Sequence, residues 1–572
     1  MSVVRLNQSS VEDKVSMKTR SSLLLGILLA LVLCALPRPA AADCTAIQNF
    51  LAGKAISVTC FHTDDLRVPP PPPLGTGPTP PVTPADNTLV TTFADGTSLP
   101  TPTAAEGSKF SFTPVTDLGV ISNGPTTFTT TKVPGIQVEG WFADDPSGEA
   151  RFLLRFPDDW NGKLVVAGAS GTRSEFNGEW AWSDYVLPLG YAYASQNKGV
   201  LNLFFAMLGS VKQPASDPYS CRLTADPTLG YSTLWAHFYD NDVLVAQYPG
   251  VGFDRLKPFT QWTRYVIETA LLAQDAVKVN YHHHTHRTYV VGTSNGGYQV
   301  RRALEEAPDI FDGGVDWEGT FVDPKGPNIL IDLPPAIKNF PGYIKGGCSP
   351  TGPEAQAIQA AGYPPDLVKT CDPTYPQVDP TKGTLWTRYS GQFWEVTACQ
   401  WQKRFDPTFD TYGDLSVNQL GNLGNYDYLS RIQNVPGVFR SVDKVETTGD
   451  IGKPLITVAG TMDALLPIKR GARAYEAAVR EARERHHHED GDGHHHPAYR
   501  LYEVQNGNHI EGFALIFPQL QIIQPHAQKA FDLLVDYVEN GKKLPPSQCI
   551  PKGGSIEHNP SQPGHCANLL VP

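Results

Sequence analysis

The sequence predicts an α/β fold in which helices cover a mostly parallel, doubly wound sheet. The first observation is a set of short apolar runs that end at or next to glycine, as buried parallel strands do. Examples are "GKLVVAG" at 162–168 and "RTYVVGTS" at 287–294. The second is the stretch at 259–281, where apolar residues recur every three or four positions, as on one face of a helix. Strands that alternate with helices in this way form parallel sheets.

The other core elements continue this alternation along the chain. Two runs with period-two alternation, 136–142 and 150–156, predict a pair of adjoining strands. Further strands are expected at 190–196, 452–460 and 498–504, and further helices at 298–308 and 524–541. The last helix ends at Gly541, a residue type suited to helix C-termini.

Composition divides the chain into five segments. Between about 320 and 448 the alternation stops, and Pro, Gly, Trp and Tyr are frequent, which indicates an insertion into the core. The expected segments are a signal-peptide region (1–42), a proline-rich N-terminal segment (43–130), the first part of the core (131–320), a lid insertion (321–448) and the second part of the core (449–572).

The first 42 residues have the pattern of a secretory signal. Lys18 and Arg20 precede an uncharged apolar run at 23–36, and three alanines at 40–42 supply a small-residue cleavage site. The run is too short to span a bilayer comfortably. We therefore expect a secreted protein, extracellular or periplasmic, without stable membrane insertion. The segment after it carries five consecutive prolines at 69–73 and is expected to be an irregular linker or surface strap.

Charge and cysteine content narrow the function classes. The chain of 572 residues has a formal net charge of −12, which disfavours binding to nucleic acid or anionic lipid. Eight cysteines remain after the signal region, an even number that favours disulfides in an exported chain. No pair has CxxC spacing, so a zinc site is disfavoured. Short loops suggest three pairs and leave a fourth, although the sequence does not fix the pairing: Cys44–Cys60, Cys348–Cys371, Cys549–Cys566 and Cys221–Cys399.

Ser294 is the candidate nucleophile. It lies in Gly-Thr-Ser-Asn-Gly, after a predicted strand and before a predicted helix. In a nucleophile elbow, small residues two positions away are needed because the strand and helix approach closely, and Gly292 and Gly296 meet that need. The backbone N–H of Asn295, at the helix start, is the first candidate oxyanion donor. A glycine-rich turn with a surface serine is the alternative.

A serine hydroxyl needs a base to accept its proton. Behind a nucleophile elbow, the chain order is serine, acid, histidine. Asp463 follows the predicted strand at 452–460, where the acid is expected, although an aspartate that caps the next helix is the alternative. His509 follows the predicted strand at 498–504 and is the candidate base. His526, at a predicted helix start, is the second choice.

Two further groups of residues complete the candidate site. The loop after the strand at 162–168 exposes backbone N–H groups, of which Ala169 or Ser170 is the candidate second oxyanion donor. Trp180, Trp182 and Trp317 are candidates for the wall of a substrate pocket, with packing in the core as the alternative.

Two histidine clusters, "HHHTH" at 282–286 and "HHHEDGDGHHH" at 486–496, lie in predicted connections away from this edge of the sheet. Loose binding of transition metals is one interpretation, and composition favours exposed solvated insertions.

Several motifs resemble a known superfamily. "WNGKLVVAG", "LGYAYASQNKG", "GTSNGG" and "FDGGV" are similar to the tannase and feruloyl-esterase branch of the α/β-hydrolases. "DALLP", "YEVQNGNHIEGFA" and "LPPSQCIPKGG" resemble secreted 3-hydroxybutyrate-oligomer hydrolases. The resemblance covers about 135–320 and 450–556. It implies an α/β-hydrolase fold, and it supports the roles given above for Ser294, Asp463 and His509.

One departure from the tannase pattern bears on the substrate. Tannase-type esterases commonly carry a disulfide between the residue before the serine and the residue after the histidine, but these positions hold Thr293 and Ile510. We therefore expect a serine carboxylic-ester hydrolase for short 3-hydroxybutyrate oligomers or similar esters, with no cofactor and no metal. The alternatives are a tannase-like or feruloyl-esterase-like aromatic ester hydrolase, a peptidase on the same scaffold, and a non-catalytic or metal-binding exported protein. The sequence leaves the oligomeric state open.

Overall fold

The computed structural model describes most of the chain after residue 43. The described residues are 44–67, 90–92, 98–100, 131–145, 150–171, 175–176, 178–199, 202–206, 220–223, 232–236, 259–371, 382–406, 408–411, 422–490 and 496–572. The predicted signal-peptide region and the run of five prolines lie outside them. Residues from Cys44 onward form one compact unit. Over the described ranges, no helix has both the length and the apolar character needed to cross a membrane.

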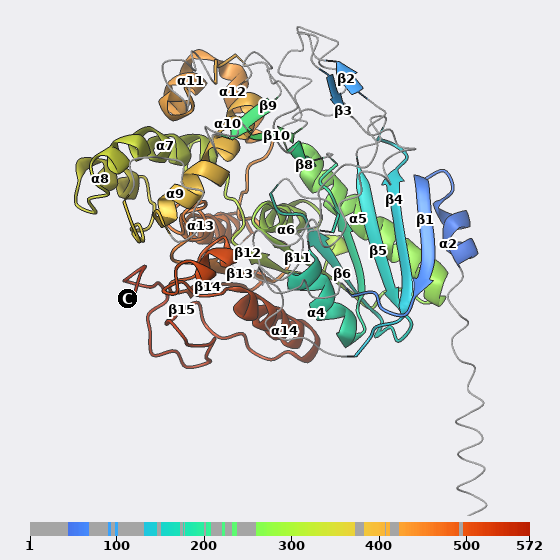
Figure 1. The fold of residues 1–572 in the computed structure, drawn as a ribbon. Coiled ribbons are helices and arrows are strands. Elements are labelled where there is room, and N and C mark those ends of the chain that lie inside the picture. The colour runs from blue at the N-terminus through green and yellow to red at the C-terminus, as the bar shows by residue number, and fades with distance from the viewer. Residues whose placement is uncertain are drawn as a thin grey trace, which may run out of the picture. The chain divides into compact units, whose positions relative to one another are not determined.

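The described residues form a ten-stranded sheet, drawn in Figure 1. In spatial order its strands are β1 (Ala55–Thr63), β4 (Gly135–Phe142), β5 (Arg151–Pro157), β7 (Ala192–Gln196), β6 (Lys163–Gly168), β11 (Arg287–Thr293), β12 (Gly313–Trp317), β13 (Leu455–Gly460), β14 (Tyr499–Val504) and β15 (Gln548–Ile550). From β7 to β15 every neighbouring pair is parallel, and the pairs from β1 to β7 are antiparallel. The prediction of a mostly parallel sheet is confirmed.

Among the described residues, five short strands lie outside this sheet. They form a two-stranded sheet from β2 (Val90–Thr92) and β3 (Ser98–Pro100) and a three-stranded one from β8 (Asn202–Ala206), β10 (Ser232–Ala236) and β9 (Ser220–Leu223).

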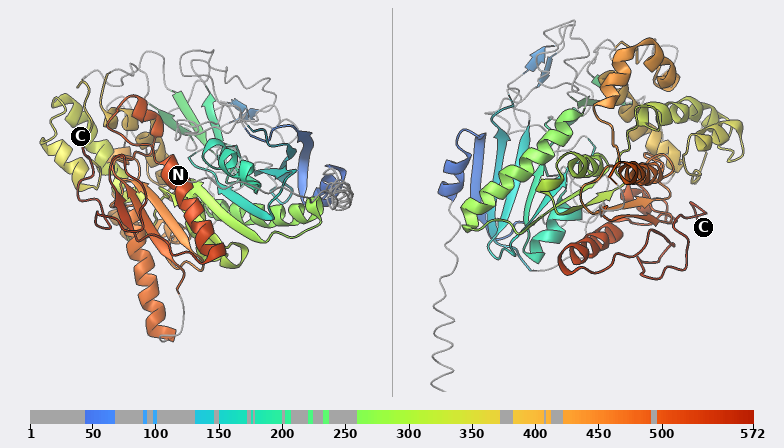
Figure 2. Two further views of the ribbon diagram at one scale, coloured as in Figure 1. Left: turned by 90° about the horizontal axis from the view of Figure 1, so that it is seen from below. Right: turned by 180° about the vertical axis from the view of Figure 1, so that it is seen from behind.

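Helices cover both faces of the main sheet (Figures 1 and 2). On one face α5 (Thr260–Tyr281) and α6 (Asn295–Glu306) pack on the central strands, and Figure 2 shows α5 lying across them. On the other face α14 (Gln524–Asn540) packs through Phe531 and Leu534 on alternate strand residues such as Val291 and Val458. The helix α13 (Ala472–Asp490) contacts β13 and β14. The sheet is therefore doubly wound, as predicted.

Shorter helical elements complete the core. They are α2 (Cys44–Leu51), η2 (Glu179–Ser183), α4 (Asp184–Val186), η3 (Leu187–Leu189), η6 (Pro308–Ile310) and η9 (Glu511–Leu515).

The segment between β12 and β13 is largely helical. Its elements are α7 (Ile329–Lys345), α8 (Pro353–Ala360), α9 (Leu385–Tyr389), η7 (Ser390–Trp394), α10 (Glu395–Phe405), η8 (Leu423–Asn425), α11 (Tyr428–Asn434) and α12 (Pro436–Asp443). We call this segment the helical insertion. Its aromatic and aliphatic side chains share one apolar cluster with the loops that follow β13 and β14. Movement of the insertion as a lid stays a prediction.

The N-terminal segment differs from the prediction. Residues 43–130 were expected to be irregular, but Cys44–Leu51 form α2 and Ala55–Thr63 form β1, which pairs antiparallel with β4 at the edge of the sheet. The prediction was wrong for these residues because "AISVTCFHT" has enough β-branched and aromatic residues to form an edge strand.

Three of the four suggested disulfides are confirmed. Sulfur–sulfur bonds join Cys44 to Cys60, Cys348 to Cys371, and Cys549 to Cys566. Cys399 is also disulfide-bonded. The side chain of Cys221 lies outside the described residues, so the Cys221–Cys399 pairing stays a prediction.

Candidate active site

Ser294 lies between β11 and α6 in a strained backbone conformation. Its φ of 57° and ψ of −121° fall outside the regions that non-glycine residues usually occupy. Backbone hydrogen bonds hold it there. The Ser294 N–H donates to the Trp317 carbonyl at 2.8 Å, and the Tyr298 N–H donates to the Ser294 carbonyl at 3.0 Å. This strand–turn–helix geometry is that of a nucleophile elbow.

The glycines around Ser294 allow the close approach of three backbone segments. A Cβ atom on Gly292 would lie 2.3 Å from the Gly296 carbonyl oxygen, and one on Gly296 would lie 2.5 Å from the Gly168 carbonyl oxygen. Neither distance is compatible with a side chain, because all these contacts are with backbone. Glycine at these positions is therefore a packing requirement of the elbow.

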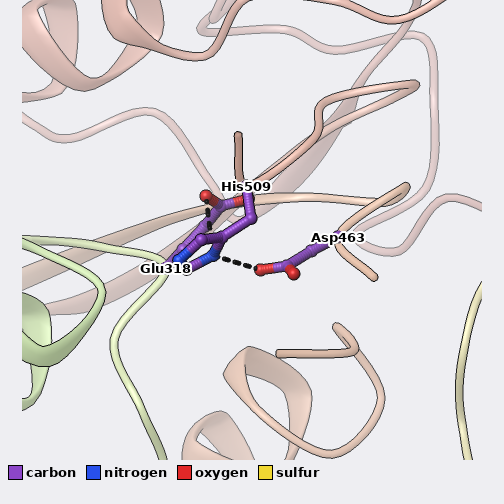
Figure 3. A group of neighbouring side chains, drawn as sticks. All are labelled: Glu318, Asp463 and His509. Atoms are coloured by element: carbon purple, nitrogen blue, oxygen red, sulfur yellow. Dashed lines mark hydrogen bonds and ion pairs between the residues drawn. The ribbon is translucent and has the colours of Figure 1, made fainter. Parts of the chain in front are cut away.

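Asp463 and His509 lie at the carboxyl ends of the neighbouring strands β13 and β14, and both are buried. The His509 Nδ1 atom lies 2.8 Å from the Asp463 Oδ2 atom, as Figure 3 shows. The other carboxylate oxygen of Asp463 accepts the backbone N–H groups of Leu465 and Leu466, both at 2.7 Å. These bonds fix the carboxylate, which in turn fixes the ring of His509 with its proton on Nδ1.

The opposite ring nitrogen of His509 has a different environment. Within the described part of the chain, Nε2 is buried and has no hydrogen-bond partner. With Nδ1 as donor to Asp463, this nitrogen is the acceptor of the neutral ring. His526, the second choice from sequence, lies near the start of α14, where burial lowers its pKa to about 4.

A second carboxyl group, which the sequence reasoning missed, adjoins this pair. Glu318 follows β12, is buried, and places its Oε2 atom 3.5 Å from Nδ1 of His509 (Figure 3). Burial, and secondarily repulsion from Asp463, raises the pKa of Glu318 well above its ordinary value. Ligand atoms of Glu318, Asp463 and His509 all lie within 4.8 Å of one another, a spacing that also suits a metal ion. The 2.8 Å contact is a hydrogen-bond distance and favours the acid–base interpretation.

Hydrogen bonds in the loop after β6 indicate which of its backbone N–H groups can be oxyanion donors. The Ala169 N–H already donates to the side-chain oxygen of Gln299 at 2.9 Å, so this structure does not leave it for a substrate. The buried ammonium of Lys198 donates to the carbonyl oxygens of Ala169 and Ser170, at 3.1 and 3.3 Å. Because N–H and C=O point in opposite directions across a trans peptide, the N–H groups of Ser170 and Gly171 point away from Lys198.

Asn295 begins α6, where the first N–H groups have no acceptor within the helix. Its side chain is fixed separately, by acceptance of the Thr320 hydroxyl at 3.0 Å. The candidate donors are therefore the Asn295 and Ser170 N–H groups, and Ala169 is no longer favoured.

The tryptophans proposed for the pocket are placed differently. Trp182 and Trp317 are each about 1% exposed and belong to the apolar cluster beneath α14, with ring centroids 6.5 Å apart. The structure assigns both indoles to the core, so the pocket prediction is corrected for them. The side chain of Trp180 lies outside the described residues.

The helical insertion contacts the loops that carry Asp463 and His509. The Tyr389 hydroxyl donates to the side-chain oxygen of Asn508 at 2.8 Å and accepts the Ile510 N–H at 3.3 Å, so it binds both neighbours of His509. The indole N–H of Trp394 donates to the Ala464 carbonyl at 2.6 Å, next to Asp463. The insertion therefore supports the positions of Asp463 and His509.

The two histidine clusters lie in segments that precede β11 and β14, whereas Ser294 and His509 follow these strands. The cluster at 282–286 connects α5 to the start of β11, the opposite end of the strand from Ser294, and its histidines are exposed. In the second cluster His486 pairs with Asp450 at 2.9 Å, and residues 491–495 lie outside the described part.

Comparison with known sequences identifies similarity in the C-terminal part. Residues 411–568 match the family model "3HB-oligomer hydrolase (3HBOH)", a range that contains Asp463 and His509. A D-(-)-3-hydroxybutyrate oligomer hydrolase of Burkholderia cenocepacia (strain HI2424) is 33% identical over 129 residues, 21% of this chain and 17% of the relative. The corresponding protein of Burkholderia thailandensis is 32% identical over 131 residues, with the same shares of each chain covered. The similarity thus spans less than a fifth of these relatives.

Solved structures with a similar arrangement include two fungal proteins. An esterase from Aspergillus oryzae has a TM-score of 0.39 and 15% identity, and the comparison covers 75% of this chain and 85% of that one. Tannin acyl hydrolase from Aspergillus niger has a TM-score of 0.39 and 13% identity, with 74% and 82% covered. The sheet order and the elbow after β11 define the fold independently. The chain has an α/β-hydrolase fold, and its C-terminal part is similar to the 3HB-oligomer hydrolases.

Proposed function

We propose that this chain is an exported serine carboxylic-ester hydrolase that acts through an acyl-enzyme. The observation that carries the proposal is the hydrogen bond from His509 to Asp463 at the ends of β13 and β14. The same edge of the parallel sheet carries Ser294 in an elbow after β11. A nucleophile, an acid and a base in this chain order, on this sheet, are the arrangement of the α/β-hydrolase triad.

The first half of the reaction forms the acyl-enzyme. His509 Nε2 accepts the proton of the Ser294 hydroxyl while the serine oxygen attacks the ester carbonyl carbon. Asp463 holds the ring through Nδ1 and stabilises the imidazolium that results. When the tetrahedral intermediate collapses, the ester C–O bond breaks and His509 returns the proton to the departing alcohol.

The oxyanion of the intermediate needs donors that are in place before the reaction. The Asn295 N–H, at the positive end of α6, and the Ser170 N–H supply them. In the second half, water attacks the acyl-enzyme with His509 again as base, and the carboxylic acid leaves Ser294. The proposed chemistry requires no cofactor.

The proposed substrates are short 3-hydroxybutyrate oligomers or similar esters. Support comes from the match at residues 411–568, which includes the acid and the base. Export is supported by the disulfides Cys44–Cys60, Cys348–Cys371 and Cys549–Cys566, since such bonds persist in oxidising compartments.

The first test removes the nucleophile. Ser294→Ala should lower kcat for p-nitrophenyl butyrate by about 10³-fold or more, because no acyl-enzyme can form without the serine oxygen. Wild type should be labelled at Ser294 by a fluorophosphonate, as checked by mass spectrometry. Ser441→Ala, a buried serine on α12, is the matched control. Near-wild-type turnover by Ser294→Ala would contradict the triad.

The second test identifies the ester. Purified protein is offered hydroxybutyrate dimers and trimers, gallate and ferulate esters, and a peptide substrate, and the products are separated by chromatography. The proposal expects the highest kcat/KM for the hydroxybutyrate oligomers. A preference for gallate or ferulate esters would keep the mechanism and replace the substrate class.

A further inference from the structure

Glu318 combines three unfavourable features at one residue. Its φ of 53° lies in the left-handed region, which glycine adopts more readily than other residues. Its carboxyl group is buried, with a side-chain exposure of 1%. Over the described residues, its Oε2 atom has no hydrogen-bond partner. Such costs at a single position indicate a functional role when the surrounding structure enforces them.

The surrounding structure does enforce this position. The Glu318 N–H donates to the Val458 carbonyl at 2.8 Å, and the Gly460 N–H donates to Oε1 of Glu318 at 2.9 Å. Both bonds tie Glu318 to β13, the strand that leads to Asp463. On the other side of Glu318 in the chain, the Gly319 N–H donates to Asp316 Oδ1 at 2.7 Å. The carboxyl group is therefore held with Oε2 beside the ring of His509.

We propose that Glu318 is a second positioning carboxyl group for His509, which flanks Nδ1 beside Asp463 and accepts the Nδ1–H hydrogen bond when Asp463 cannot. This inference rests on the proposed function. The 3.5 Å distance from Oε2 to Nδ1 is longer than the 2.8 Å distance to Asp463, so Asp463 is the acceptor in the resting protein. A small rotation of the His509 ring or of the Glu318 carboxyl group would make Glu318 the acceptor in place of Asp463.

The charges around Glu318 explain why Glu318 and Asp463 do not compete to accept the Nδ1–H hydrogen bond of His509. The titratable groups that act on it are Asp463 and Glu511, and it adjoins His509 and Tyr389. Both acidic neighbours and its burial favour the neutral form of Glu318. The pair Glu318–Asp463 therefore presents a single negative charge to the ring while Asp463 is ionised.

Loss of the Asp463 charge changes this balance. In Asp463→Asn, one source of repulsion on Glu318 is gone, so its carboxyl group ionises more readily. The anion is then available to accept Nδ1–H and to stabilise the imidazolium. Glu318 should thus support residual catalysis in this variant.

A double-mutant cycle tests the proposal on p-nitrophenyl butyrate between pH 6 and 9. Asp463→Asn should lose most of kcat but retain a residual activity that increases with pH as Glu318 ionises. Glu318→Gln should lower kcat by about twofold to fivefold in the wild-type background, and by about twentyfold or more in the Asp463→Asn background. The double variant should also lose the pH-dependent part of the residual activity.

Two further variants keep the result interpretable. Glu305 is a buried glutamate of α6 whose pKa burial also raises. Glu305→Gln is the matched control and should change kcat by the same factor in both backgrounds. Glu318→Asp retains the charge but shortens the side chain, so it should reproduce the Glu318→Gln result if reach to Nδ1 matters. Thermal unfolding of each variant checks that it is folded.

The outcomes separate the two proposals. Equal factors for Glu318→Gln in both backgrounds, with no change in the pH profile, would overturn the role of Glu318 while an inactive Ser294→Ala upholds the triad. Full activity in Ser294→Ala would overturn the proposed function, and the role of Glu318 with it. Unequal factors together with the lost pH dependence would support Glu318 as a positioning residue.

Discussion

Two aspartates, Asp316 in the parallel core and Asp366 in the helical insertion, have different hydrogen-bond partners. In the core, Asp316 on β12 is fully buried and lies 2.7 Å from the guanidinium of Arg301. It also accepts the Thr457 hydroxyl at 2.9 Å. In the insertion, Asp366 accepts hydrogen bonds from neutral donors, the Tyr343 hydroxyl at 3.0 Å and the Trp386 N–H at 2.8 Å.

This difference separates two contributions to the candidate site. In the core, the Arg301–Asp316 ion pair fixes the turn that carries Glu318, and this turn adjoins Ser294 through the bond from the Ser294 N–H to the Trp317 carbonyl. Around Asp463 and His509, the insertion contributes apolar cover and neutral hydrogen bonds, such as those of Tyr389 and Trp394. The predictions below disturb one region at a time.

The largest effect is expected from breaking the core pair. Arg301→Met should lower the free energy of unfolding by about 3–5 kcal/mol, because Asp316 is left as a buried carboxylate without its cation. The turn at 316–320 should loosen as well, since Arg301 also donates to the Thr320 carbonyl at 3.3 Å. Urea unfolding and kcat on p-nitrophenyl butyrate measure the two consequences.

The control for Arg301→Met is an exposed ion pair. Lys542 and Asp536 lie 3.0 Å apart near the end of α14 and are well exposed. Lys542→Met should leave the free energy of unfolding nearly unchanged, because solvent screens such pairs. Similar losses for both variants would contradict the distinction between buried and exposed pairs.

The second effect concerns the pH dependence of the insertion. Burial raises the pKa of Asp366 from 3.8 to about 7. Between about pH 4 and pH 7 the folded state therefore retains a proton that the unfolded state has lost, so this group's contribution to stability decreases as pH increases. Asp366→Asn mimics the protonated carboxyl group. The variant should gain of the order of 2 kcal/mol relative to wild type across this window.

Urea unfolding of both proteins at several pH values measures this difference and cancels the contributions of other groups. Asp427→Asn, which changes an exposed carboxylate at the start of α11, is the matched control. If the difference in free energy of unfolding between wild type and Asp366→Asn stays constant from pH 4 to pH 7, the pKa of Asp366 is not raised in the folded protein.

The same comparison explains what the sequence predicts well. The strands β6, β11, β13 and β14 were found where expected, because burial of their apolar residues leaves a strong pattern in the sequence. The residues after three of these strands, Ser294, Asp463 and His509, could be chosen from their order in the chain. The sheet edge brings Asp463 and His509 into contact.

The missed residues depend on contacts that sequence patterns do not carry. The strand β12 reads Gly-Gly-Val-Asp-Trp, and glycine and aspartate are disfavoured in strands. Packing requires Gly314, because a Cβ atom there would lie 2.8 Å from the Val300 side chain. Glu318 was missed because the strand before it was not recognised. The engagement of the Ala169 N–H by Gln299 joins residues 130 positions apart and has no local signal.

The smallest effect tests how the insertion supports the base. Tyr389→Phe removes the hydroxyl that binds Asn508 and the Ile510 N–H on either side of His509. Stability should fall by about 1 kcal/mol, whereas kcat should fall by about tenfold because the imidazole is held less accurately. Tyr428→Phe removes another buried hydroxyl of the insertion, which donates to the Pro324 carbonyl at 2.7 Å. It should cost similar stability with little change in kcat. If both variants lower kcat equally, the insertion acts on catalysis through general stability, and Tyr389 has no particular part in holding His509.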